Sequence, residues 1–143
     1  MQPIDFDEVL DKIIEKDPVF HREAYLFLRE GLDYAQKKIG KANKHEIRHI
    51  TGKELLEGLR EYGISMYGPL TATVLKEWGV TRCENFGEMV FKMVDNGLLS
   101  KTEHDTMEDF KGGYNFYDAF NKPFLPAAKV KSKDSESIQS EKP

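Results

Sequence analysis

Apolar residues recur every three or four positions along most of residues 5 to 126, with charged residues between them. This spacing is typical of amphipathic helices, and we expect a mostly α fold, a compact bundle of about five or six helices. The first helix is expected to begin after Asp5, because aspartate is a good N-cap and Glu8 stands three residues later. Its apolar face would then consist of Phe6, Val9, Leu10, Ile13 and Ile14.

Proline and glycine set the expected limits of the second helix. Asp17 suits an N-cap and Pro18 suits the first helical position, so we expect this helix to run from Pro18 to Ile39. Gly40 is the expected stop, because glycine readily adopts the backbone conformation that ends a helix.

Capping signals also delimit the third and fourth expected helices. Thr51 and Glu54 form a capping box at the start of the third, which we expect to reach Tyr67. Pro69 suits the first turn of a fourth helix, which we expect to end at Gly79. The residues of this fourth helix that are expected to face inward are Leu70, Val74, Leu75 and Trp78.

The fifth helix has the clearest amphipathic pattern in the chain. Thr81 and Glu84 form another Thr-x-x-Glu box at its start, and Gly97 closes it. Its apolar residues follow the i, i+3, i+4, i+7, i+8 pattern at Phe86, Met89, Val90, Met93 and Val94.

A short helix is expected within residues 100–110, followed by an aromatic run after Gly113. The aromatic residues are Tyr114, Phe116, Tyr117, Phe120 and Phe124. Burying an apolar side chain contributes roughly 1.5 to 3 kcal/mol, so leaving all five in water would be costly. We therefore expect an aromatic C-terminal strap across the helices, and a small hairpin near Leu98 or Tyr114 stays open as an alternative.

The expected domain organisation is one helical domain, residues 1–126, and a polar tail, residues 127–143. With 143 residues and a mass of 16.5 kDa, the chain is long enough for a single domain with its own core. The tail consists mainly of lysine, serine and glutamate, and it has too few apolar residues to offset the entropy cost of ordering. We expect the tail to be disordered.

Cysteine content and hydropathy point to a cytoplasmic protein. Cys83 is the only cysteine, so the chain can form no internal disulfide and no thiolate metal cluster, and we interpret Cys83 as a small packing residue. No apolar run approaches the roughly 20 residues needed to cross a bilayer, and the acidic N-terminal residues differ from a signal peptide. We expect no membrane partner.

Charge is distributed unevenly, although the net charge is only −4. Residues 1–36 carry four basic and nine acidic side chains, and residues 84–118 carry three and eight. Between them, residues 37–53 carry six basic and one acidic. This basic segment could bind an acidic protein surface or phosphates, although it lacks the interleaved aromatics that stack on bases. The candidate binding residues are Lys37, Lys38, Lys41, Lys44, Arg48, His49 and Lys53.

The same segment contains the string H-E-x-x-H at positions 45–49, which in zinc hydrolases places two metal ligands one helical turn apart. His45 and His49 are therefore weak candidate ligands, with Glu46 as the base. The third histidine of the extended motif is replaced by Leu55, and the Thr51 cap indicates that the string precedes a helix. We expect solvated histidines, no metal and no cofactor.

Several sequence blocks resemble a known family. The blocks are Phe6-Asp-Glu-Val-Leu, Ala24-Tyr-Leu-Phe-Leu-Arg-Glu, Arg48-His-Ile-Thr-Gly-Lys-Glu-Leu-Leu-Glu-Gly, Glu77-Trp-Gly-Val, Asn85-Phe-Gly-Glu and Asp109-Phe-Lys-Gly-Gly-Tyr. Together they are similar to the small uncharacterised family described as restricted to Verrucomicrobia and Planctomycetes. The resemblance covers most of residues 5–126, and it implies no activity, cofactor or catalytic residue.

The sequence alone does not assign a biochemical function. The leading hypothesis is a non-enzymatic helical protein that binds a protein partner through the basic segment or the aromatic strap. One alternative is a small zinc-dependent hydrolase that uses His45, Glu46 and His49. Another is a nucleic-acid-associated regulator that uses residues 37–53.

Overall fold

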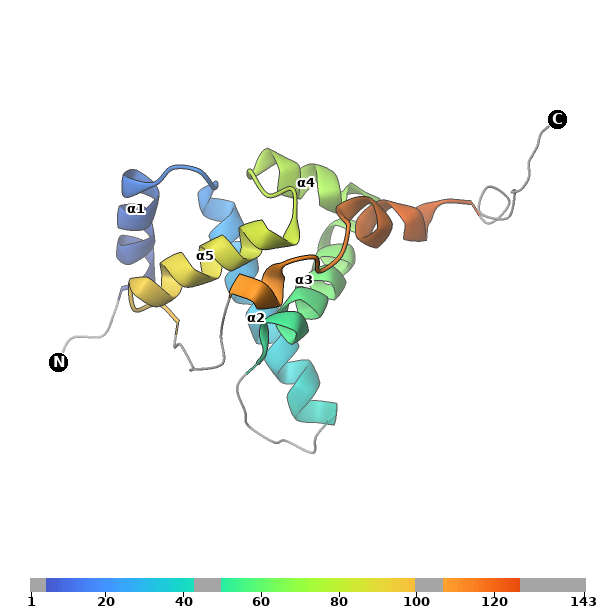
Figure 1. Ribbon diagram of the computed structural model, residues 1–143, viewed down its shortest axis with the longest axis horizontal. Helices are drawn as coiled ribbons and strands as arrows, with labels where there is room; N and C mark the ends of the chain where they lie inside the picture. Colours follow the sequence, from blue (N-terminus) through green and yellow to red (C-terminus); the bar gives the residue numbers. More distant parts are fainter. Residues whose placement is uncertain (1–4, 43–49, 100–106, 127–143) are drawn as a thin grey trace.

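The computed structural model describes residues 5–42, 50–99 and 107–126 (Figure 1). It is mostly helical, with five α-helices: α1 (Phe6–Lys16), α2 (Arg22–Ala42), α3 (Gly52–Tyr67), α4 (Thr71–Glu77) and α5 (Cys83–Asp95). Four short elements complete it: the 3₁₀ turns η1 (Gly68–Leu70), η2 (Met107–Phe110) and η4 (Lys122–Phe124), and the π-helical turn η3 (Tyr117–Asn121). The predicted helical bundle is confirmed. Within the described ranges, which include Leu98 and Tyr114, there is no strand.

The first helix forms as predicted. The Asp5 side chain accepts a hydrogen bond from the backbone N–H of Glu8 and so caps the helix. Arg22, in the first turn of α2, binds Asp7 at 2.8 Å and also Asp11. These ion pairs connect α1 to the start of α2.

The second helix begins four residues later than predicted. Asp17 does not open α2; it ends α1, because its backbone N–H donates to the carbonyl of Ile13 and its carboxylate binds Lys92. His21 takes the capping position instead, since its Nδ1 accepts from the backbone N–H of Glu23. The cause is tertiary: the backbone N–H of His21 donates to the carbonyl of Trp78, at the far end of α4.

Gly40 does not end the second helix, which continues to Ala42. Glycine in a helix interior costs about 1 kcal/mol relative to alanine, but it does not force a stop. Ile39 packs against the core one residue earlier, so packing carries the helix past the glycine.

Helices α2 and α3 lie side by side at the centre of the bundle (Figure 1). The bounds of α3 match the prediction, and Thr51 and Glu54 form the predicted capping box with distances of 3.0 and 3.1 Å. Small residues allow the two helices to approach closely. A Cβ atom added at Gly58 would lie 2.6 Å from the Cβ of Ala35, well inside contact distance.

The fourth helix is shorter than predicted and starts differently. Gly68 and Pro69 begin the 3₁₀ turn η1, and the α-helix starts only at Thr71. Thr71 is fully buried, and its hydroxyl lies 2.7 Å from the carbonyl oxygen of Gly68. The prediction that Leu70 faces inward is wrong, because η1 turns this side chain into solvent.

The N-cap of the fifth helix lies one residue later than expected, at Arg82 instead of Thr81. Arg82 is the N-cap residue, and Asn85 replaces Glu84 as the reciprocal partner: its Oδ1 accepts from the backbone N–H groups of Thr81 and Arg82. The predicted end is confirmed, because Gly97 has the positive φ of 79° that favours glycine at a helix end.

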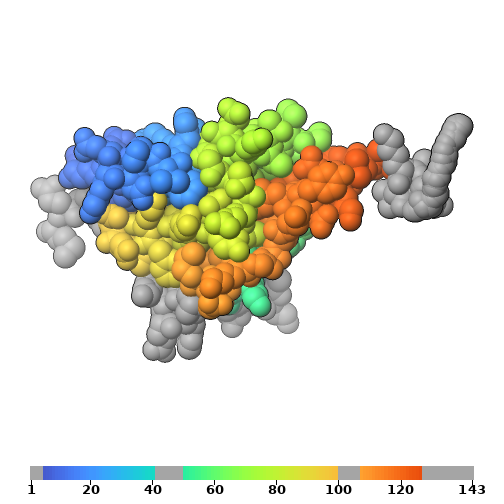
Figure 2. All heavy atoms as spheres, turned by 45° about the horizontal axis from the view of Figure 1, so that its top comes forward, coloured from blue at the N-terminus to red at the C-terminus, as the bar shows by residue number. Residues whose placement is uncertain are grey.

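The C-terminal strap forms only in part. The segment 107–126, orange to red in Figure 2, extends along the molecule beside the yellow-green residues of α4 and the following turn. Tyr114 donates its hydroxyl proton to the carbonyl of Leu56 at 2.8 Å, and Phe120 is fully buried. Tyr117 and Phe124, however, stay exposed. Of the short helix expected within residues 100–110, the described part is the 3₁₀ turn η2.

One buried polar group lacks a partner among the described residues: the hydroxyl of Tyr25. Burial raises the pKa of Tyr25 to about 12, with further contributions from Asp17 and Glu88. An unpaired buried hydroxyl costs about 1 to 3 kcal/mol, so Tyr25→Phe is expected to increase the free energy of unfolding by about 1 kcal/mol. Urea unfolding would measure this change. A loss of stability instead would mean that the hydroxyl has a partner in solution.

Candidate functional site

The basic segment contributes little free charge where the structure describes it. Lys37 binds Asp33 at 2.9 Å, and Lys38 binds Glu61, which lies on α3. The hydrogen bond from Lys38 lowers the pKa of Glu61. Two of the predicted binding residues are therefore already paired with carboxylates of the chain itself.

The other predicted basic residues are placed only in part. Lys53 is exposed in the first turn of α3, and Lys41 lies in the last turn of α2. Lys44, Arg48 and His49 fall outside the described residues, and so do His45 and Glu46 of the H-E-x-x-H string. The described part of the chain holds no group of three or more metal-ligating side chains. The hydrolase and nucleic-acid hypotheses stay untested predictions.

A polar hollow of about 600 Å³ lies between α2 and α3, and Lys37 is one of the residues that line it. Lys37 pairs with Asp33, and Tyr62 donates to Glu30 at 2.6 Å. The guanidinium of Arg29 lies over the ring of Phe6, 4.2 Å from its centroid. Because most of its polar groups contact one another, this hollow has the character of a solvated groove between two helices.

Cys83 is a buried packing residue. Its sulfur lies 3.4 Å from the backbone nitrogen of Tyr114 and 3.5 Å from that residue's carbonyl oxygen, so it holds the strap against α5. Burial raises the pKa of the Cys83 thiol, which disfavours the nucleophilic thiolate. The role of Cys83 is therefore to pack α5 against the backbone of Tyr114.

In the described ranges, no helix has the length and apolar character that a membrane-spanning segment requires.

The most distinctive surface feature is a set of large apolar side chains at one end of the bundle. Six large apolar residues are exposed in the described chain, and five of them lie on the C-terminal end of α3, on η1 and on the segment from η3 to just beyond η4. These five, which we call the terminal apolar surface, are Met66 (53% exposed), Leu70 (62%), Tyr117 (53%), Phe124 (42%) and Leu125 (37%). The sixth, Val19, lies between α1 and α2.

The elements that carry the terminal apolar surface contact one another. Turn η1 directly continues α3, and it packs against η3 of the strap, which continues into η4. Gly68, with a positive φ of 53°, makes the sharp change of direction after α3 that places Leu70 outside. The surface is therefore assembled from two segments that are almost fifty residues apart in sequence.

Local hydrogen bonds fix the part of the surface that the strap contributes. The side chain of Asn115 accepts from the backbone N–H groups of Tyr117 and Asp118, at 2.8 and 3.2 Å, and so starts the helical turn. Ala119 and Phe120 then anchor the inner side in the core, while Tyr117 points outward.

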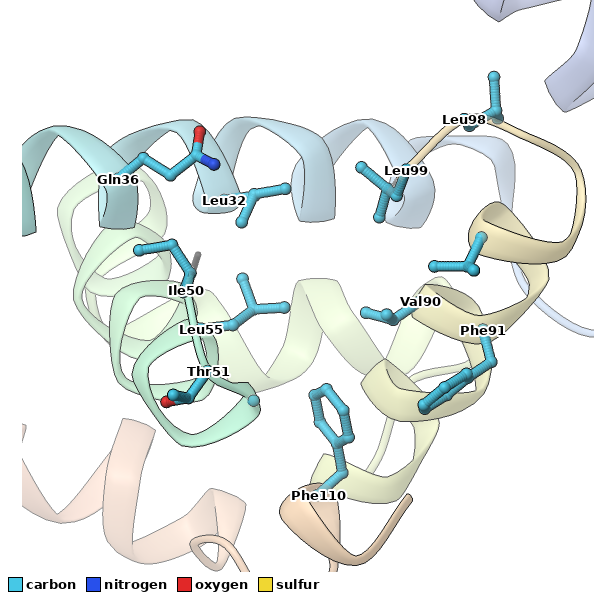
Figure 3. A pocket seen from close by; sticks show the side chains of 12 residues that line it. Leu32, Gln36, Ile50, Thr51, Leu55, Val90, Phe91, Leu98, Leu99 and Phe110 are labelled. Atoms are coloured by element: carbon cyan, nitrogen blue, oxygen red, sulfur yellow. The ribbon is translucent and has the colours of Figure 1, made fainter. Parts of the chain in front are cut away.

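A second candidate site is an apolar pocket of about 350 Å³ between α2, α3, α5 and η2. Figure 3 shows Leu32, Leu55 and Val90 pointing toward one another around it, with Phe110 closing one side. Gln36 and Thr51 lie at one end. Every described residue that lines this pocket is uncharged.

Sequence reasoning found neither of these sites as such. The prediction placed Leu70 in the core, because spacing along a helix does not show that a 3₁₀ turn precedes it. Tyr117 and Phe124 belong to the aromatic run that the sequence did identify, but their exposure depends on the register of a π-helical turn. Of the residues that line the pocket, Val90 and Val94 were predicted to lie on the apolar face of the fifth helix. A hollow was not predicted there, since a hollow depends on how four elements meet.

Searches of protein-family models, of curated proteins and of solved structures give no significant match for this chain.

Proposed function

We propose that this protein is a non-enzymatic helical interaction module, which binds a protein partner through the terminal apolar surface. The observation that carries the proposal is the gathering of five of the six exposed large apolar residues at one end of the bundle. Soluble proteins rarely expose contiguous apolar patches without a function, and such patches commonly mark contact surfaces.

The composition of the surface supports a protein as the partner. Aromatic residues and methionine are enriched in the centres of protein interfaces, and the surface offers Met66, Tyr117 and Phe124. The tyrosine hydroxyl can add a hydrogen bond while its ring is buried. An apolar or amphipathic segment of the partner is the complementary chemistry.

We also propose that the protein is located in the cytoplasm. Its only thiol, Cys83, is buried and contacts the backbone of Tyr114, an arrangement that suits a reducing compartment without requiring one.

The test compares partner capture by the wild-type chain with capture by the double variant Leu70→Ser, Phe124→Ser. Removing central apolar anchors commonly costs about 2 kcal/mol or more of binding free energy, which is about 30-fold in affinity. Capture of a defined partner from host lysate should therefore fall sharply, while the circular dichroism of the double variant should match the wild type, because both side chains are exposed.

Val19→Ser provides the matched control, because Val19 is as exposed as Leu70 but lies outside the surface. This variant should capture the partner as well as the wild type does. A partner that is retained equally by all three proteins would show that the terminal apolar surface is not the binding site.

A further inference from the structure

The apolar pocket is separate from the terminal apolar surface. Gly52, at the start of α3, lines the pocket, whereas Met66 lies fourteen residues later on the same helix. At 1.5 Å per residue, these two positions are about 21 Å apart along the helix axis. The two sites can therefore be tested independently.

The volume of the pocket is large enough for a small-molecule ligand. A volume of about 350 Å³ lies in the range of small-molecule pockets, roughly 300 to 1,000 Å³. An apolar cavity of about 150 Å³ holds a benzene molecule, so by proportion this pocket holds a body of about fourteen non-hydrogen atoms.

The uncharged residues that line the pocket disfavour a charged ligand. Charged residues make up 32% of the chain, yet none of the described residues that line the pocket is charged. The aliphatic side chains of Leu32, Leu55 and Val90 and the ring of Phe110 supply apolar contacts. Among the labelled side chains, the polar groups of Gln36 and Thr51 stand at one end. A charged molecule would lose its hydration here without gaining an opposite charge from the described residues of the lining.

We propose that this pocket binds a compact, uncharged, mainly apolar small molecule, with its apolar body between Leu32, Leu55, Val90 and Phe110. A ligand that fills the hollow would give its apolar walls dispersion contacts that they otherwise lack. Two stretches of chain that are adjacent in sequence to the lining residues Ile50 and Leu99 are mainly polar in composition. Residues 43–49 and 100–106 contain a single apolar residue in their sequence, Ile47.

The probe for the test is N-phenyl-1-naphthylamine, an uncharged aromatic amine with three rings and about seventeen non-hydrogen atoms, slightly more than the volume estimate, so that part of it would extend from the open side of the pocket. Its fluorescence rises in apolar surroundings. We expect saturable binding of one probe per chain to the full-length protein. The methyl resonances of Leu32, Leu55 and Val90 should shift on titration. The sulfonated analogue, 8-anilino-1-naphthalenesulfonate, should bind at least about tenfold more weakly, because its charge must be desolvated.

Filling the pocket should abolish binding. Leu32→Trp and, independently, Val90→Phe should each lower the affinity for the uncharged probe by about tenfold or more, since each occupies the space of the ligand. The matched control is Leu26→Trp, on the same helix, at a partly buried leucine that does not line the pocket. It should bind as the wild type does, and so should the double variant Leu70→Ser, Phe124→Ser.

Four results would overturn the proposal. They are the absence of saturable binding, binding that both filling variants leave unchanged, equal affinity for the sulfonated analogue, and about tenfold tighter binding by Ile47→Ser. The last result would mean that the side chain of Ile47 is the true occupant. Unchanged probe affinity in Ile47→Ser, together with loss of binding in the filling variants, supports a separate small ligand.

Discussion

Phe86→Ala is expected to lower the free energy of unfolding by about 3 to 5 kcal/mol, the usual cost of removing a buried phenylalanine ring. Phe86 is fully buried on α5, and its ring centroid lies 6.4 Å from that of Phe27 and 6.0 Å from that of Phe116. It thus connects α5 to both α2 and the strap. Because a domain of this kind is stable by about 5 to 15 kcal/mol, the loss would be at least about a fifth of the total.

Urea unfolding followed by circular dichroism measures this loss. Phe124→Ala is the control within the same chain, since its ring is exposed and should contribute less than about 1 kcal/mol. Similar losses for the two variants would contradict the described core, because they would place both rings in equivalent surroundings.

Gly58→Leu is expected to lower the free energy of unfolding by about 3 kcal/mol, at the upper end of what overpacking a core costs. A Cβ at this position would lie 2.6 Å from the Cβ and 3.3 Å from the Cα of Ala35, so helices α2 and α3 would have to separate. Leucine has a much higher helix propensity than glycine, which rules out a local backbone effect as the cause of any loss. Thermal and urea unfolding would both report it.

An exchange of residues between the two helices isolates the steric cause. Gly58→Ala alone should be destabilising, and the double variant Ala35→Gly, Gly58→Ala should recover most of the loss, because it moves one methyl group across the interface without adding volume. If the two substitutions were simply additive, the close contact between α2 and α3 would be refuted.

The sequence predicted the helices whose ends are determined locally. The capping box of Thr51 and Glu54 and the N-cap at Asp5 depend on groups within one turn, and the structure has both. The start of α2 could not be predicted in this way. It depends on a hydrogen bond from His21 to Trp78, fifty-seven residues away, and local signals at Asp17 and Pro18 pointed elsewhere.

The candidate sites were also less predictable than the helices, because they depend on contacts between residues that are far apart in sequence. Helical periodicity separates inner from outer positions only where a regular helix continues, and Leu70 lies in a 3₁₀ turn that follows the sharp bend at Gly68. The basic segment was visible in the sequence, but the pairing of Lys38 with Glu61 required the packing of α2 on α3. Both features are properties of the assembled tertiary structure.

Site-specific photo-crosslinking inside the host cell tests the central claim most directly. A benzophenone-bearing amino acid would replace Phe124 in one variant and Leu70 in a second, with Val19 as the exposed apolar control. We predict that both surface positions crosslink to the same protein partner, and that Val19 gives no such adduct. An adduct of twice the mass of the chain would identify the partner as a second copy. Crosslinks from Val19 alone, or no protein adduct from either surface position, would contradict the proposed function.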